Sequence, residues 1–118
     1  MRILVVDDST TMRRILKNAL KQIGEEDVVE AGNGAEATEK MDGVELIFTD
    51  WNMPEMDGLA FVKWVRERNE YAKVPIIMVT TEGAKTDLIT AIKAGVNQYI
   101  RKPFTADTVK EKVQAVLS

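Results

Sequence analysis

Apolar and polar residues alternate along the chain in five rounds, each of which joins a short apolar run to a longer amphipathic segment. Three of the apolar runs are continuous, which is typical of strands that are buried on both faces of a parallel sheet. The longer segments repeat their apolar positions at helical spacing. We therefore expect strands at residues 2–6, 27–30, 45–49, 75–79 and 98–101, and helices at about 10–23, 34–41, 58–67, 85–94 and 106–117.

The helix expected at 10–23 has the clearest pattern, with an apolar stripe on one face and four basic residues on the other. The stripe holds Met12, Ile15, Leu16, Ala19, Leu20 and Ile23, and the basic face holds Arg13, Arg14, Lys17 and Lys21. The two last helices have apolar sets of Leu88, Ile89, Ala91 and Ile92, and of Val109, Val113, Val116 and Leu117. The helix expected at 34–41 has the weakest pattern.

Residues that favour helix ends flank most of these segments. Short polar side chains accept hydrogen bonds from the first turn of a helix, and glycine tolerates the left-handed conformation that often ends one. The expected N-caps are Asn33, in a capping box with Glu36, Asp57 and Thr105, and the expected glycine stops are Gly24 and Gly95.

Alternating strands and helices predict the α/β class, a doubly wound five-stranded parallel sheet flanked by five helices. At 118 residues, the chain is expected to form one domain that spans 1–118. In such a sheet, the loops that follow strands one, three, four and five can meet at the same edge. These loops carry Asp7, Asp8, Asp50, Thr80, Thr81 and Lys102.

Three carboxylates at one edge would repel one another unless a cation neutralised them. Because the sequence has no histidine and no cysteine, any ligands would be oxygen atoms, which favours Mg²⁺, Mn²⁺ or Ca²⁺. Asp8 and Asp50 suit direct ligation of Mg²⁺, and Asp7 suits contact through water. Lys102 and the Thr80 hydroxyl could hold phosphoryl oxygens, and a carboxylate can itself be the nucleophile.

Each of these residues, taken alone, has an ordinary structural explanation. Asp7 and Asp8 could cap a helix, Asp50 could be a solvated strand end, and Lys102 could be a surface lysine. Only their joint placement at successive strand ends favours a site.

Composition narrows the remaining function classes. The net charge of −3 gives no overall basic field that would attract nucleic acid or an anionic membrane. No apolar run approaches the ~20 residues of a membrane span, and the apolar start is too short for a signal peptide. We therefore expect a cytoplasmic protein without nucleic-acid or membrane partners. We also expect a monomer.

The sequence resembles the response-regulator receiver domain, and in particular its single-domain chemotaxis members. The matching stretches span essentially the whole chain. They include Val5-Val6-Asp7-Asp8-Ser9, Asp50-Trp51-Asn52-Met53-Pro54-Glu55-Met56-Asp57-Gly58-Leu59, Met78-Val79-Thr80 with Glu82, and Tyr99 followed by Lys102-Pro103-Phe104-Thr105. The resemblance implies the flavodoxin-like (βα)5 receiver fold.

The resemblance also implies a magnesium-dependent phosphorylation site. Asp50 would accept a phosphoryl group from a phosphohistidine on a sensor kinase. Asp8, Asp50 and the backbone carbonyl of Asn52 would ligate Mg²⁺, with Asp7 contacting the ion less directly.

Further roles follow from the same resemblance. Thr80 and Lys102 would hold the phosphoryl oxygens, and the Lys102–Pro103 peptide bond would be cis. Asn52 and Glu82 would line the approach to the phosphoacceptor and tune hydrolysis.

The implied output is binding rather than enzymatic turnover of a substrate. Phosphorylation would draw the Thr80 hydroxyl inward, turn Tyr99 from exposed to buried and remodel the surface of the fourth helix, fifth strand and fifth helix. The implied partners are the chemotaxis histidine kinase CheA, the flagellar motor switch protein FliM and a phosphatase. The chain would catalyse only its own aspartyl phosphorylation and slow dephosphorylation.

Three other functions are weighed against this one. A phosphorelay intermediate, which passes its phosphoryl group to another histidine, shares the same fold and site. A Mg²⁺ phosphohydrolase would have D-x-D-x-T after the first strand, where this chain has Asp7-Asp8-Ser9-Thr10. A flavin carrier would have a Ser/Thr/Gly phosphate-binding loop after the first strand, where this chain has its acid pair. The sequence also contains no G-x-x-x-x-G-K-[ST] motif, which excludes a nucleotide-binding P-loop.

Overall fold

A computed structural model describes residues 1–81 and 85–117, so Glu82 lies outside the described residues. The strands are β1 (Ile3–Val6), β2 (Val28–Ala31), β3 (Leu46–Thr49), β4 (Ile76–Thr80) and β5 (Gln98–Arg101). The helices are α1 (Thr10–Gln22), α2 (Gly34–Thr38), α3 (Gly58–Arg66), α4 (Lys85–Ala94) and α5 (Ala106–Leu117), with a short 3₁₀ helix, η1 (Asn69–Tyr71). All ten expected elements are therefore confirmed in order.

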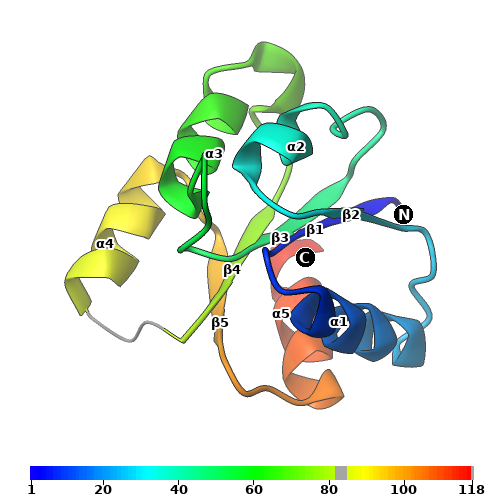
Figure 1. Cartoon of the computed structure of the whole chain (residues 1–118). Coiled ribbons are helices and arrows are strands. Elements are labelled where there is room, and N and C mark those ends of the chain that lie inside the picture. Colours follow the sequence, from blue (N-terminus) through cyan, green and yellow to red (C-terminus); the bar gives the residue numbers. More distant parts are fainter. Residues whose placement is uncertain (82–84, 118) are drawn as a thin grey trace.

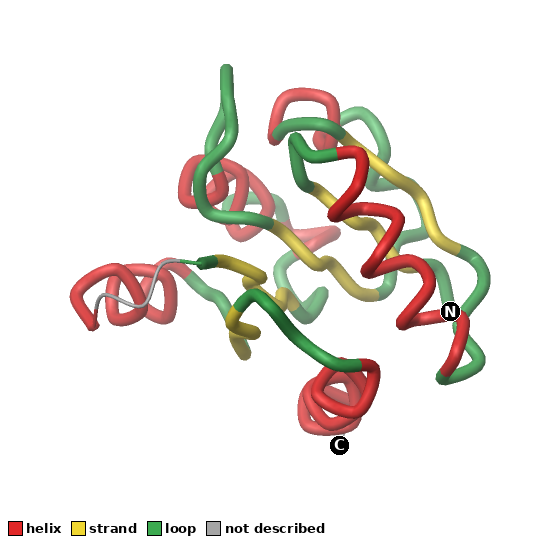
Figure 2. Tube along the Cα trace, turned by 60° about the horizontal axis from the view of Figure 1, so that its bottom comes forward, coloured by secondary structure: helices red, strands yellow, loops and turns green. Residues whose placement is uncertain are grey.

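The five strands form one parallel sheet in the order β2-β1-β3-β4-β5. Helices α1 and α5 cover one face, and α2, α3 and α4 cover the other (Figure 1). The second view shows the same arrangement of helices around the sheet (Figure 2). Because β1 pairs with both β2 and β3, the chain reverses its direction across the sheet at β1. Open α/β sheets bind ligands at the carboxyl ends of the strands at such a point.

The core has two parts, one on each face of the sheet. In β1, Ile3 and Val5 pack on the side of α1 and α5, whereas Leu4 and Val6 pack on the side of α2 and α3. All four residues are buried. This two-sided burial explains why the strand is a continuous apolar run, because alternate side chains on a strand point to opposite faces.

The N-caps expected at Asn33, Asp57 and Thr105 are confirmed, but the capping box differs from the predicted one. The Asn33 side chain accepts a hydrogen bond from the Glu36 amide at 2.8 Å, and the Glu36 carboxylate accepts one from the Gly32 amide at 2.9 Å. The capping box is thus shifted by one residue, since Glu36 reaches Gly32 rather than Asn33. Asp57 and Thr105 accept hydrogen bonds from Ala60 and Thr108, at 2.9 and 3.2 Å respectively.

Several positions differ from the expected pattern. Helix α2 ends at Thr38 rather than near residue 41, although Met41 is still buried in the core. Four apolar residues of the predicted stripes are exposed, because each outer helix touches the sheet on one side only and its stripe is wider than the buried strip. They are Ile15, Ile89, Ile92 and Leu117.

Arg66, at the end of α3, joins three segments at the amino-terminal edge of the sheet. Its guanidinium donates to the carbonyl of Gly95 at 2.8 Å and to the carbonyl of Val74 at 2.7 Å. Burial lowers the pKa of Arg66. The side chain also fills the space beside Gly95, whose φ of +120° suits glycine. Among the described residues, no helix is long and apolar enough to cross a membrane.

Candidate metal centre at the carboxyl end of the sheet

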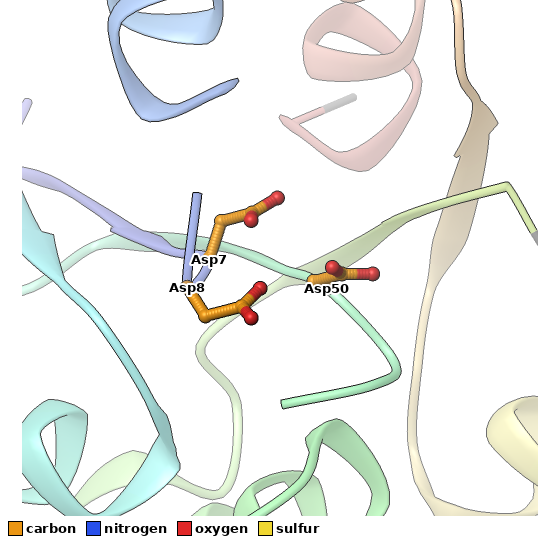
Figure 3. A group of neighbouring side chains, drawn as sticks. All are labelled: Asp7, Asp8 and Asp50. Atoms are coloured by element: carbon orange, nitrogen blue, oxygen red, sulfur yellow. The ribbon is translucent and has the colours of Figure 1, made fainter. Parts of the chain in front are cut away.

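Three carboxylates lie close together at the carboxyl ends of two neighbouring strands. Strand β1 runs into Asp7 and Asp8, and β3 runs into Asp50. The Asp50 amide donates to the Val6 carbonyl at 2.9 Å, which continues the parallel ladder by one residue. One carboxylate oxygen from each acid lies within 4.8 Å of the others, and Asp8 points toward Asp50 (Figure 3). The convergence expected from the topology is therefore confirmed.

Among the described residues, Lys102 is the cation that forms ion pairs with the carboxylates of this cluster. Its backbone amide donates to the Thr80 carbonyl at 3.0 Å, just after β5. Its Nζ lies 2.9 Å from Asp7 Oδ2 and 3.3 Å from Asp50 Oδ2. The Lys102–Pro103 peptide bond is cis, as the resemblance implied. The loop after β5 thus directs the amine across β4 toward the acids.

Burial and like charges make the site electrostatically unfavourable without a cation. Asp50 is 9% exposed, and its burial raises the pKa of its carboxyl. Lys102 opposes this rise and Asp7 adds to it. For Lys102, burial alone lowers the pKa, but hydrogen bonds and charge from Asp7 and Asp50 outweigh it and raise the pKa overall. One ammonium faces three carboxylates, so the donor set is suited to a divalent cation.

The loop between β3 and α3 packs tightly behind Asp50. The Trp51 amide donates to Asp50 Oδ1 at 2.7 Å, and the Gly58 amide donates to the Trp51 carbonyl at 2.9 Å. A Cβ at Gly58 would overlap the Asp50 carbonyl oxygen. Glycine is thus needed at 58 because α3 begins against the Asp50 backbone. Asn52 lies in this loop, two residues after Asp50, and its side chain is exposed.

The remaining predicted residues lie on β4 and β5. Thr80 is buried at the end of β4, and Thr81 beyond it is exposed. Thr49 pairs with Met78, so Thr80 lies two residues beyond the level at which β3 ends. Tyr99 on β5 is 41% exposed and borders a cavity of about 200 Å³. The cavity is lined by Met78, Leu88, Ala91, Ile92, Val96, Asn97, Gln98 and Tyr99.

Sequence reasoning missed the role of Arg13. The helical pattern placed this residue on the solvent face of α1, but its side chain is only 17% exposed. The guanidinium turns back to the Asp7 carbonyl, and Nε lies 3.2 Å from Glu30 Oε1 on β2. No local pattern connects positions 13 and 30, since the contact depends on the pairing of β1 with β2.

Comparison with known proteins places these features in a family. The response regulator receiver domain family matches residues 3–114. The chemotaxis protein CheY1 of Helicobacter pylori is 58% identical over 120 residues, which cover 99% of this chain and 97% of that protein. A chemotaxis protein CheY homolog of Campylobacter jejuni is also 58% identical, with 99% and 92% covered.

A solved structure agrees with these relatives. The chemotaxis protein CheY4 of Vibrio cholerae superposes with a TM-score of 0.90 at 35% identity, and the match covers 98% of this chain and 97% of that one. Sequence and structure thus point to the same family, of which chemotaxis signalling proteins are members. The chain belongs to the response regulator receiver family and is a receiver of the CheY chemotaxis type.

Proposed function

We propose that Asp50 accepts a phosphoryl group from a histidine kinase in a Mg²⁺-dependent reaction, and that the phosphorylated chain binds the flagellar motor switch. One observation carries the chemistry: the Asp50 carboxylate lies at a strand end with two further carboxylates within 4.8 Å and an ammonium at 3.3 Å. Phosphoryl transfer requires such positioning and charge stabilisation more than it requires covalent help from the protein.

The donor set fits Mg²⁺, and the hydrogen bonds that the acids already make separate direct ligands from a contact through water. Asp7 Oδ1 accepts the Ser9 amide at 2.9 Å and Asp7 Oδ2 accepts Lys102 at 2.9 Å. Both oxygens of Asp7 are therefore engaged, which favours contact with the ion through water. The proposed direct ligands are Asp8, which is exposed, Asp50, which is largely buried, and the backbone carbonyl of Asn52. Bound Mg²⁺ would neutralise the carboxylates and the incoming phosphoryl oxygens.

In the proposed transfer, one carboxylate oxygen of Asp50 forms a bond to phosphorus while the bond between phosphorus and the kinase imidazole nitrogen breaks. The electron pair of that bond stays on the imidazole. The Lys102 ammonium and the Thr80 hydroxyl hold the phosphoryl oxygens, as point charge and hydrogen-bond donor. Water later hydrolyses the acyl phosphate and restores the carboxylate. Because the product stays attached to the chain until then, the site acts as the input of a switch.

The output is proposed to pass through Thr80 and Tyr99. Movement of the Thr80 hydroxyl toward the phosphoryl group would free space beside β5, and the neighbouring cavity of about 200 Å³ could receive the Tyr99 ring. Half-exposed Tyr99 suits this role because an apolar ring with a polar tip tolerates both settings. The proposed partners are the kinase CheA for the unphosphorylated form and the switch protein FliM for the phosphorylated form.

Mass spectrometry after incubation with acetyl phosphate tests the chemistry. We expect a phosphate adduct on the parent protein only when Mg²⁺ is present, and no adduct on Asp50→Asn. Asp42→Asn is the matched control, because Asp42 is an exposed acid outside the cluster. An undiminished adduct on Asp50→Asn would overturn the assignment.

Lys102→Ala tests the link from phosphate to output. We expect this variant to fold but to lose the gain in motor-switch affinity on phosphorylation, because no ammonium then holds the phosphoryl group. A normal gain in affinity would exclude Lys102 from the switch. Transfer of phosphate from the chain to a second histidine protein, without motor-switch binding, would favour the relay function instead.

A further inference from the structure

Arg13, a residue that the proposed chemistry does not use, contacts the loop that carries Asp7 and Asp8. Its guanidinium reaches back from the first turn of α1 and donates through Nη1 to the Asp7 carbonyl. Nε donates to Glu30 Oε1 at 3.2 Å, and Nη2 donates to Thr10 Oγ1 at 3.3 Å. The three donors thus tie the end of β1 to β2 and to the start of α1.

With the contact from Arg13, the backbone amide, the carboxylate and the backbone carbonyl of Asp7 each have a hydrogen-bond partner. Its backbone amide donates to the Ala31 carbonyl at 3.1 Å, and its carboxylate accepts Lys102 at 2.9 Å. Arg13 holds the remaining polar group, the carbonyl. That carbonyl belongs to the peptide unit that joins Asp7 to Asp8. The orientation of this peptide unit therefore sets the position of the Asp8 backbone.

The guanidinium is itself held at its far end. Glu30 accepts from Arg13 and also lies 3.5 Å from the Lys17 ammonium. The Glu30 backbone carbonyl accepts from Lys40 at 2.6 Å, and Lys40 also donates to Glu36 at 2.8 Å. Arg13 is therefore anchored to β2 and α2 through a continuous set of ion pairs and hydrogen bonds. A hydrogen bond from such a fixed charged donor is stronger than one between neutral groups.

We infer that Arg13 is a positioning residue for the metal site, which fixes the Asp7–Asp8 peptide so that the exposed Asp8 carboxylate points toward Asp50. This inference rests on the proposed function, because it concerns the affinity of the same three acids for Mg²⁺. Residues that orient metal ligands typically change metal affinity by 10- to 100-fold when they are removed. A guanidinium that served only the fold would change stability and leave metal affinity as it was.

Mg²⁺ titration followed by the fluorescence of Trp51, which adjoins Asp50, separates the two roles. A Trp64→Phe background removes the second tryptophan of the sequence. Arg13→Ala is compared with Arg14→Ala, an exposed neighbour on the same helix. Unfolding by urea is measured in parallel, and beryllofluoride binding is measured at saturating Mg²⁺.

We expect Arg13→Ala to bind Mg²⁺ roughly 10-fold more weakly and to bind beryllofluoride normally once Mg²⁺ is saturating. Arg13→Lys should recover part of the loss, since lysine supplies one charged donor, and Arg14→Ala should match the parent. Unchanged Mg²⁺ affinity in Arg13→Ala would overturn the inference, whatever its stability. If Arg13→Ala does not fold, Glu30→Gln replaces it and should weaken Mg²⁺ binding in the same direction; parental affinity in that variant would overturn the inference.

Failure of the proposed function would look different. In that case the parent protein itself would show no Mg²⁺-dependent fluorescence change and no beryllofluoride binding. A parent that binds both, beside an Arg13→Ala variant that also binds both with parental affinity, would contradict only the positioning role.

Discussion

Replacement of Asp50 by asparagine should stabilise the metal-free protein at neutral pH. The substitution keeps the shape of the side chain and removes one of three negative charges that share the carboxyl edge of the sheet. The amide can still accept the 2.7 Å hydrogen bond from the Trp51 backbone. The expected effect is opposite to that of most substitutions at buried positions, which destabilise.

The magnitude follows from the charges around Asp50. At an effective dielectric constant of about 20, two unit charges at the 4.8 Å limit of the cluster repel by about 3.5 kcal/mol, so Asp7 and Asp8 together contribute about 7 kcal/mol. The attraction to Lys102 at 3.3 Å is worth about 5 kcal/mol on the same scale. The balance is a net repulsion of about 2 kcal/mol. Solvent screening of exposed Asp8 reduces this value, and burial of Asp50 increases it.

The effect should depend on pH in a defined direction. Because the pKa of Asp50 is raised in the folded state, mainly by burial, its contribution to stability is greatest below the pKa of the unfolded chain and is lost as pH rises through the folded pKa. The asparagine variant does not titrate here. Its advantage over the parent should therefore be absent in acid and should grow as pH rises toward neutrality.

Urea unfolding followed by far-UV circular dichroism, in EDTA and at low ionic strength, measures this difference. The Asp42→Asn variant, which removes an exposed acid outside the cluster, should match the parent within about 0.5 kcal/mol. Addition of Mg²⁺ should stabilise the parent and have less effect on Asp50→Asn. If Asp50→Asn were less stable than the parent at neutral pH without metal, the cluster would not hold the uncompensated repulsion that the geometry indicates.

Two further substitutions test the packing that supports the site. Gly58→Ala should destabilise the fold by about 2 kcal/mol or more, since its Cβ would overlap the Asp50 carbonyl; urea unfolding that matches the parent would show that α3 can shift without cost. Arg66→Met should cost about 2–3 kcal/mol through the lost hydrogen bonds to Gly95 and Val74, while phosphate acceptance at Asp50 persists; simultaneous loss of phosphate acceptance in a folded variant would contradict the structural role.

The order of elements and the convergence of the acids could be predicted because both depend on local signals. Continuous apolar runs mark the buried strands, and the position of an acid directly after such a run places it at the carboxyl edge of a parallel sheet. The caps at Asn33 and Asp57 are likewise properties of a few neighbouring residues. These signals require no knowledge of distant contacts.

The contacts that cross the sheet could not be predicted in this way. Helical periodicity assigned Arg13 to the solvent face, because the pattern of one helix contains no information about Glu30, which lies near Arg13 on β2. It also assigned Ile15 and Ile92 to buried stripes, although only part of each stripe packs against the rest of the fold and both side chains are exposed. Burial of a long side chain and exposure of an apolar one both depend on which elements pack together, and this is set by the whole fold.

The most direct test of the central claim is the affinity of the chain for a FliM motor-switch peptide, measured with Mg²⁺ in the presence and absence of beryllofluoride. The expected result is tighter binding with beryllofluoride for the parent protein and no change for Asp50→Asn. Equal affinity of the parent protein under both conditions, with beryllofluoride shown to be bound, would contradict the claim that phosphorylation of Asp50 switches motor binding.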